Sequence, residues 1–191
     1  GSPAVQNDRS VVYNYVENTW STMTLARSSY ADASTYDVPY ATEYNSTDVP
    51  TISNLSGATN TFGSSLYYAH EVGNNEIALD GTETAIPAYI QSGDFDLPNG
   101  GDGENMLRLS RFLPDFKNLQ GNAVVTIFLK NYPVDSGTSS QLGPFTIDAN
   151  TEKIDTRARG RLANIKIQNT AINETWRFGT FRADVNPDGK R

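Results

Sequence analysis

The sequence has no cysteine and a single histidine, His70. Without cysteine neither a disulfide nor a thiolate metal site can form, and one histidine cannot build a histidine-based zinc site alone. No apolar run approaches the roughly 18 residues of a membrane-spanning helix, and patterns with helical periodicity are scarce. We therefore expect no membrane span and no cofactor, and a fold held together by packing.

What the sequence does contain is typical of β structure. Its 191 residues are 37% hydrophobic and 10% aromatic, and short apolar runs alternate with Gly, Asn, Asp, Ser and Pro. Such runs bounded by turn residues favour an all-β fold. The chain opens on "GSPAVQ", without methionine, so we expect it to be a piece of a longer protein.

Two regions are expected. Residues 1–84 should form β hairpins and a long polar loop at the edge of a propeller-like or meander β region, with one hairpin at residues 11–23 that turns at 17–19, and a loop over residues 26–65. Residues 85–191 should form an antiparallel β-sandwich, because strand-like runs recur there with turns between them. The expected strands are 104–113, 122–132, 143–148, 153–160, 161–169 and 174–185.

Parity within each strand predicts which side chains form the core. The expected core residues are Val12, Trp20, Leu107, Leu109, Val125, Ile127, Leu129, Ile165, Ile167, Trp176 and Phe178.

Charge is distributed unevenly along the chain. Residues 1–104 carry two basic residues against fourteen acidic ones, or −12, whereas residues 105–191 carry thirteen against eight, or +5, which gives the net −7 of the whole chain. This split indicates complementary surfaces, either within one molecule or between neighbouring copies.

The segment "DTRARGRLANIKI" places Arg157, Arg159 and Arg161 at alternate positions, where one strand would present all three on one face. Beyond them the apolar residues change parity, which predicts a break at 158–161, with a bulge or a turn near Gly160 because glycine tolerates positive φ. Three interpretations remain open: a solvated ladder paired with Asp155 and nearby acids such as Glu152, a docking edge for an acidic neighbouring subunit, or a nucleic-acid contact.

Other patterns point less clearly to chemistry. Residues 94–104 hold oxygen ligands suited to calcium, but their spacing departs from that of an EF-hand. His70 has no recognisable nucleophile beside it, and the nucleophile-elbow, P-loop and dinucleotide motifs are missing, so we expect no enzyme. The potential calcium ligands are Asp94, Asp96, Asn99, Asp102 and Glu104.

Several segments resemble the C-terminal region of virion tail proteins from short-tailed, podovirus-type bacteriophages. These are "AYIQSGDFDL", "RLSRFLPDFKN", "GPFTID", "RARGRLANIKIQN" and the terminal "TWRFGTFRADVNPDGKR". The hairpin "NDRSVVYNYVENTW" is similar to a strand pair upstream in those proteins, and its tyrosine, polar turn and tryptophan resemble the last hairpin of a kelch-type propeller blade.

The resemblance implies a structural tail protein of the hub or nozzle type, located in the virion. It implies a homo-oligomeric ring around the DNA exit channel, with other tail or portal-adjacent proteins as neighbours, passing DNA that is not bound by sequence, and no catalytic residues. Arg157, Arg159 and Arg161 would then be subunit-docking residues. The alternative is a carbohydrate-binding β-sandwich of a tail fibre or receptor-binding protein, with exposed tyrosines as its platform. The tyrosines considered are Tyr36, Tyr40, Tyr67, Tyr68 and Tyr89.

Overall fold

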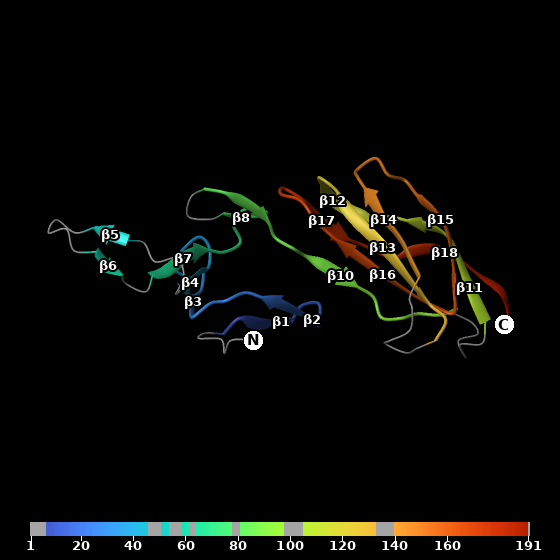
Figure 1. Ribbon diagram of the computed structural model, residues 1–191, viewed down its shortest axis with the longest axis horizontal. Helices are drawn as coiled ribbons and strands as arrows, with labels where there is room; N and C mark the ends of the chain where they lie inside the picture. Colours follow the sequence, from blue (N-terminus) through green and yellow to red (C-terminus); the bar gives the residue numbers. More distant parts are fainter. Residues whose placement is uncertain are drawn as a thin grey trace. The chain divides into compact units, whose positions relative to one another are not determined.

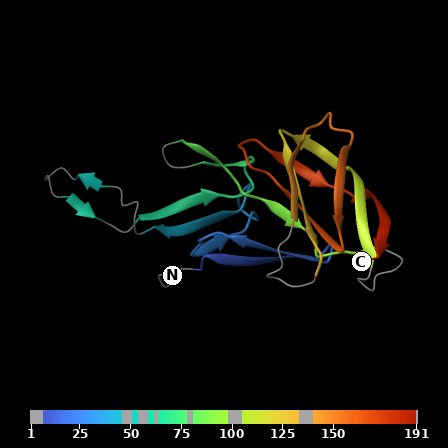
Figure 2. The same ribbon diagram turned by 45° about the vertical axis from the view of Figure 1, so that its right-hand side comes forward.

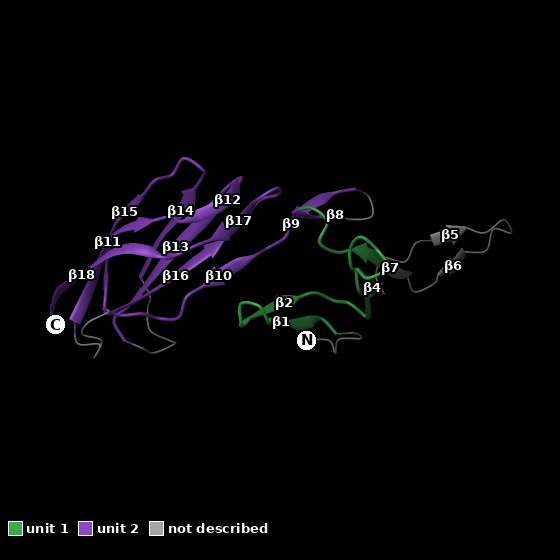
Figure 3. Cartoon of the chain, turned by 180° about the vertical axis from the view of Figure 1, so that it is seen from behind, with its two compact units in different colours: residues 1–73 green, residues 74–191 purple. Residues whose placement is uncertain are grey.

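The structure is a computed structural model that describes residues 7–45, 51–53, 59–61, 64–77, 81–97, 105–132 and 140–190. The described residues form eighteen strands and no helix, so the prediction of an all-β fold is confirmed. None of these residues belongs to a helix that could cross a membrane. The chain divides into two compact units, residues 1–73 and 74–191 (Figure 3).

The first unit contains small antiparallel sheets. A hairpin joins two strands through a turn at residues 15–18, and a three-stranded sheet of order β3-β4-β7, here called the N-terminal sheet, follows it. Two further strands pair with one another. The strands are β1 (Arg9–Asn14), β2 (Thr19–Thr24), β3 (Ser29–Ala31), β4 (Tyr40–Asn45), β5 (Thr51–Ser53), β6 (Thr59–Thr61) and β7 (Ser64–Ala69).

The expectation of a continuous loop over residues 26–65 is wrong. Strands β3 to β6 lie within that range, and β4 pairs along its whole length with β7. Strand β4 also pairs with β3, and β7 begins about twenty residues after β4, so these strands depend on pairing between separate segments that the turn residues alone do not reveal.

The second unit is a sandwich-like pair of antiparallel sheets, seen as facing layers in Figures 1 and 2. Sheet A has the order β10-β16-β13-β14 and sheet B the order β15-β11-β18, while β8 pairs with β9 and β12 with β17. The strands are β8 (Asn75–Ile77), β9 (Glu83–Ala85), β10 (Tyr89–Gln91), β11 (Asn105–Leu113), β12 (Phe116–Gln120), β13 (Ala123–Lys130), β14 (Ser140–Ile147), β15 (Ile154–Gly160), β16 (Leu162–Gln168), β17 (Thr175–Phe178) and β18 (Arg182–Lys190).

The core of the second unit lies between sheets A and B. Both sheets contribute alternate side chains to it, as the period of two predicts. Seven of the expected core residues are buried, and Trp176 and Phe178 pack against the core while partly exposed. The seven are Leu107, Leu109, Val125, Ile127, Leu129, Ile165 and Ile167.

Two expected core residues are on the surface instead. Val12 is 38% and Trp20 70% exposed. In the hairpin β1–β2, Tyr13 lies opposite Trp20 and their rings stack at 4.4 Å. The two large rings therefore cover each other, because a two-stranded hairpin has no second layer to cover them.

The segment expected as one strand over residues 174–185 is two strands in different sheets. It breaks after β17 at Gly179, whose amide donates to the carbonyl of Asp115 at 2.7 Å. A Cβ on Gly179 would lie 2.8 Å from the Asp115 carboxylate, so the close approach requires glycine here. The partner of β17 is β12, which occupies part of a stretch that was expected to be a turn.

The two units divide between residues 73 and 74, whereas the sequence suggested a boundary between 84 and 85. The difference is the hairpin β8–β9, which belongs to the second unit. Asn75 links it to the loop before β17, because its side-chain amide donates to Oδ1 of Asn173 at 2.8 Å and its Oδ1 accepts from the Asn173 amide at 2.6 Å.

Candidate functional site

Strand β15 carries two of the three predicted docking arginines on the exposed side of sheet B. Arg157 and Arg159 are exposed, and the alternate residues Ala158 and Gly160 are buried. The expected alternation therefore holds for these two arginines. Arg161 follows the end of the strand and is half-buried, so the three arginines do not form one row.

The predicted break occurs where the chain passes from one sheet to the other. Strand β15 belongs to sheet B and ends at Gly160, whereas β16 begins at Leu162 in sheet A. The Arg161 amide donates to the carbonyl of Lys130 on β13 at 2.9 Å, which ties the crossing to sheet A. The apolar positions change parity because β15 and β16 lie in different sheets. Each strand directs its apolar side chains into the core between the two sheets.

Gly160 lies where little space is left for a side chain. A Cβ at this position would lie 3.2 Å from Cβ of Leu129 and 3.3 Å from the carbonyl oxygen of Lys130, and the φ of Gly160 lies outside the left-handed region. The chain crossing brings this backbone so close to β13 that an added Cβ would press on its neighbours, which would have to move by a few tenths of an ångström.

Arg159 faces another arginine across the sheet. Arg108 on β11 is its direct partner in the register, and like charges opposite each other on a sheet repel. Arg159 is nevertheless paired with an acid two strands away, because its Nε and Nη2 donate to the carboxylate and the carbonyl of Asp188 on β18, the strand beyond β11. Within the described ranges, neither Arg108 nor Arg157 takes part in an ion pair.

Two other acidic residues of this surface, Asp155 and Asp184, are paired with cations other than the predicted docking arginines. Arg111 donates from Nε to Oδ1 of Asp155 at 3.0 Å and lies 3.7 Å from a carboxylate oxygen of Asp184, and Lys153 lies 3.2 Å from Asp155. The hydrogen bond from Arg111, followed by the one from Lys153, lowers the pKa of Asp155. Asp155 thus pairs with Arg111 and Lys153, and not with the arginines of its own strand as the solvated-ladder interpretation supposed.

The exposed side of sheet B is thus a mixed-charge surface with a cationic part. We call it the charged face and define its cationic part by Arg108, Arg157 and Arg159. Arg161 lies apart from it, with its guanidinium 5.8 Å from the ring centroid of Tyr132. Sequence parity located two of the three cationic residues. Arg108 was missed because cross-strand register depends on pairing between segments far apart in the chain.

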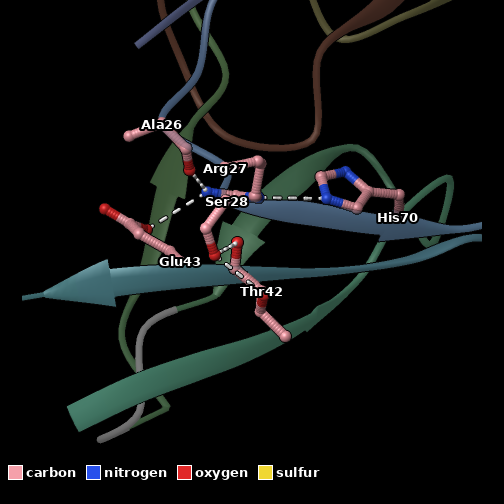
Figure 4. Close-up of polar contacts among 6 residues, drawn as sticks. All are labelled: Ala26, Arg27, Ser28, Thr42, Glu43 and His70. Atoms are coloured by element: carbon pink, nitrogen blue, oxygen red, sulfur yellow. Dashed lines mark hydrogen bonds and ion pairs between the residues drawn. The ribbon is translucent and has the colours of Figure 1, made fainter. Parts of the chain in front are cut away.

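A second polar cluster, in the first unit, was also missed (Figure 4). Arg27 is 8% exposed and donates from Nη1 to the Ala26 carbonyl at 2.6 Å and to Glu43 at 3.1 Å. Its Nε donates to Nε2 of His70 at 3.1 Å, and its guanidinium lies 4.0 Å from the ring centroid of Tyr68. The sequence could have drawn attention to Arg27, because it is one of only two basic residues among the first 104.

His70 belongs to this second cluster. His70 accepts from Arg27, and its ring centroid lies 5.9 Å from that of Tyr30. Desolvation, followed by the nearby positive charge of Arg27, lowers its pKa, against a smaller opposing effect of Glu71. The contacts make His70 part of the packing of the N-terminal sheet.

The suggested calcium ligands are only partly described. Asn99, Asp102 and Glu104 lie outside the described residues. Asp94 accepts from Nζ of Lys130 and from the side-chain amide of Asn164, both at 2.8 Å, and these bonds lower its pKa. In the described part of the chain, no three potential metal ligands of the His, Cys, Asp and Glu types gather together.

Comparison with known proteins does not assign the chain to a family. No protein-family model matches it, and no curated protein matches it in sequence. The functional proposal below therefore depends on the geometry of the described residues.

Proposed function

We propose that this chain is a structural component of a short-tailed bacteriophage tail, of the hub or nozzle type, that works through contacts with neighbouring subunits around the DNA exit channel. Its place would be in the virion tail, in a homo-oligomeric ring next to other tail or portal-adjacent proteins. The all-β architecture with several open sheets is compatible with this role, because open sheet edges offer surfaces that a neighbour can cover.

The observation that carries the proposal is the exposure of the hairpin β1–β2. Eleven of its twelve strand residues are exposed, including Val11 at 68% and Trp20 at 70%. Its turn adds Tyr15 at 83% and Val16 at 77%. A two-stranded hairpin is marginally stable in water, and exposed apolar groups gathered on one element mark an interaction surface. A neighbouring subunit that covers this hairpin would account for both features.

The charged face supports the proposal from the second unit. Arg108 and Arg157 have no ion pair among the described residues, so an acidic surface of a neighbouring copy can pair with them. The acidic residues are available, since residues 1–104 carry a net charge of −12. Charges of this kind set the orientation of subunits more than the affinity between them.

The acidic balance of the chain also agrees with a wall along which DNA passes. A net charge of −7 repels phosphates, so DNA would move past the protein without being held. The cationic part of the charged face would be covered by the neighbouring subunit in the ring and so kept away from the DNA.

Immunogold electron microscopy tests the location. Antibody raised against this chain should label the short tail beneath the capsid of phage particles from the source culture. Label on fibre tips would favour the receptor-binding alternative, and particles without label would contradict the proposal.

Sedimentation velocity tests the contacts. The wild-type chain should form higher-order species as its concentration rises, and the double substitution Val11→Thr and Trp20→Ser should shift it toward monomer. Ile172→Ser serves as the control, because Ile172 is an exposed apolar residue at 48% in the loop before β17, outside both the hairpin and the charged face. Equal loss of association in both variants would argue against a contact specific to the hairpin.

A further inference from the structure

One side of the N-terminal sheet carries aromatic, hydroxyl and small side chains without charge. Residues paired across antiparallel strands point to the same side of a sheet. The register pairs Tyr40 with Ala69 and Thr42 with Tyr67, and β3 extends the same side. We call this surface the tyrosine face, and its side chains are Ser29, Ala31, Tyr40, Thr42, Tyr67 and Ala69.

The opposite side of the same sheet is covered in part. Ala41 there is 2% exposed and Tyr68 lies beneath the guanidinium of Arg27, although Tyr30 on that side is 59% exposed. On the tyrosine face, in contrast, four of the six residues are exposed and two are half-buried. The tyrosine face is therefore the more open of the two sides.

Three tyrosines form a connected group at the tyrosine face. The rings of Tyr40 and Tyr67 stack with centroids 4.8 Å apart and planes 10° apart, and Tyr36 meets Tyr40 edge to face at 5.2 Å. Tyr67 is nevertheless 63% exposed and Tyr36 53%. Among the described side chains, Tyr40 is the only ring that stacks on Tyr67, so the Tyr67 ring remains largely exposed while the stack behind holds it in place.

Hydroxyl groups lie beside the rings. Oγ1 of Thr42 is 2.7 Å from Oγ of Ser29 and 2.9 Å from Oγ of Ser28, and Figure 4 shows the contact with Ser28. Hydroxyls can donate or accept by rotating. The tyrosine face therefore combines an exposed aromatic ring with adaptable neutral hydrogen-bonding groups.

We propose that the tyrosine face binds a neutral carbohydrate chain. A pyranose ring presents a face of C–H groups that stacks on an aromatic ring, and its hydroxyls match the serine and threonine hydroxyls. An anionic ligand is disfavoured, because residues 1–73 carry seven acidic and two basic residues and the tyrosine face itself has no cation. This activity is independent of the proposed assembly role, which uses the hairpin β1–β2 and the charged face.

The structure separates the tyrosines of this face from the others considered above. Tyr68 lies on the opposite side of the sheet, and Tyr89 belongs to β10 in the second unit, where Nζ of Lys166 lies 4.8 Å from its ring centroid. Tyr89 is 66% exposed, almost the same as Tyr67. It is therefore a matched control for the loss of an exposed tyrosine ring.

Calorimetric titration of the full chain tests the proposal. The probes are maltohexaose, cellohexaose and mannohexaose as neutral chains and hexagalacturonate as the anionic chain. At least one neutral chain should bind saturably, and hexagalacturonate should not. Tyr67→Ala should weaken that binding about tenfold by removing the stacking ring, whereas Tyr67→Phe should retain it because the ring face remains.

Two controls keep the outcome interpretable. Tyr89→Ala should bind as the wild type does, and circular dichroism of Tyr67→Ala should match the wild-type spectrum. The proposal is overturned if no neutral chain binds, if hexagalacturonate binds as tightly, or if Tyr89→Ala loses as much affinity as Tyr67→Ala. Because Tyr67→Phe preserves packing, its loss of binding would also count against the stacking role.

Discussion

Nε of Arg27 donates a hydrogen bond to Nε2 of His70 at 3.1 Å. An imidazole nitrogen can accept only through its lone pair, so His70 is neutral in the folded chain and carries its proton on Nδ1. The same guanidinium binds Glu43 and lies over Tyr68. One buried arginine thus joins the segment before β3 to β4, β7 and the residue after β7.

The pKa of His70 should lie below its usual value of about 6.5. The unfolded chain then binds a proton more readily than the folded one, so the stability due to neutral His70 is present above about pH 6.5 and decreases as the pH falls from there toward the folded pKa. Because His70 is the only histidine, its imidazole signal in a proton NMR titration is unambiguous. A midpoint at or above 6.5 would contradict this account.

Replacing Arg27 with Leu should destabilise the N-terminal sheet by about 2 to 3 kcal/mol. The cost lies at the low end of the cost of breaking a buried ion pair, because the Glu43 side chain left behind retains some contact with solvent. Amide hydrogen exchange measured by mass spectrometry should accelerate in β4 and β7 and remain unchanged in β13. The matched control is Arg9→Leu, at an exposed position of β1, which should change stability by less than about 0.5 kcal/mol. Equal effects of both changes would refute a special role for Arg27.

Gly160→Ala should destabilise the second unit by about 1 to 3 kcal/mol, because its Cβ would press on Leu129 and on the backbone of Lys130 at the crossing between the sheets. Urea unfolding followed by Trp176 fluorescence measures the effect. Gly93→Ala is the control, since its Cβ would meet nothing within 4 Å and its φ is not in the left-handed region. If the two variants unfold at the same urea concentration, the close packing at Gly160 does not contribute to the stability of the second unit.

The cationic part of the charged face should matter for association more than for folding. Arg108→Ser with Arg157→Ser should weaken self-association in sedimentation velocity, most clearly at low salt, while the melting temperature changes little, since neither has an ion pair among the described residues. Arg159→Ser also breaks the pair with Asp188, which is exposed enough to cost about 0.2 to 1 kcal/mol.

The control for these changes is Arg177→Ser, an exposed arginine on β17 outside the charged face. It should leave association unchanged. A sharp fall in melting temperature with intact association would mean that Arg108 and Arg157 brace sheet B and do not dock a neighbour.

Sequence patterns predicted much of the second unit. Alternating apolar residues in β11, β13 and β16 located both the strands and their buried sides, because the side-chain period of two is a local property of the chain. The same reasoning failed for Trp20, whose strand has the right pattern but pairs only with β1 in a two-stranded sheet and leaves this ring 70% exposed. Pattern shows which side of a strand is apolar, but a second sheet is needed to bury it.

Local sequence pattern was thus enough to predict the all-β character of the protein, most strands of the sandwich-like unit and the alternation that exposes Arg157 and Arg159. Only the tertiary structure decided that β15 and β16, adjacent in sequence, join different sheets, and that Arg108 faces Arg159. The physical reason is that strand pairing is made by hydrogen bonds between segments distant in the chain, and these contacts leave no periodic signal in either segment.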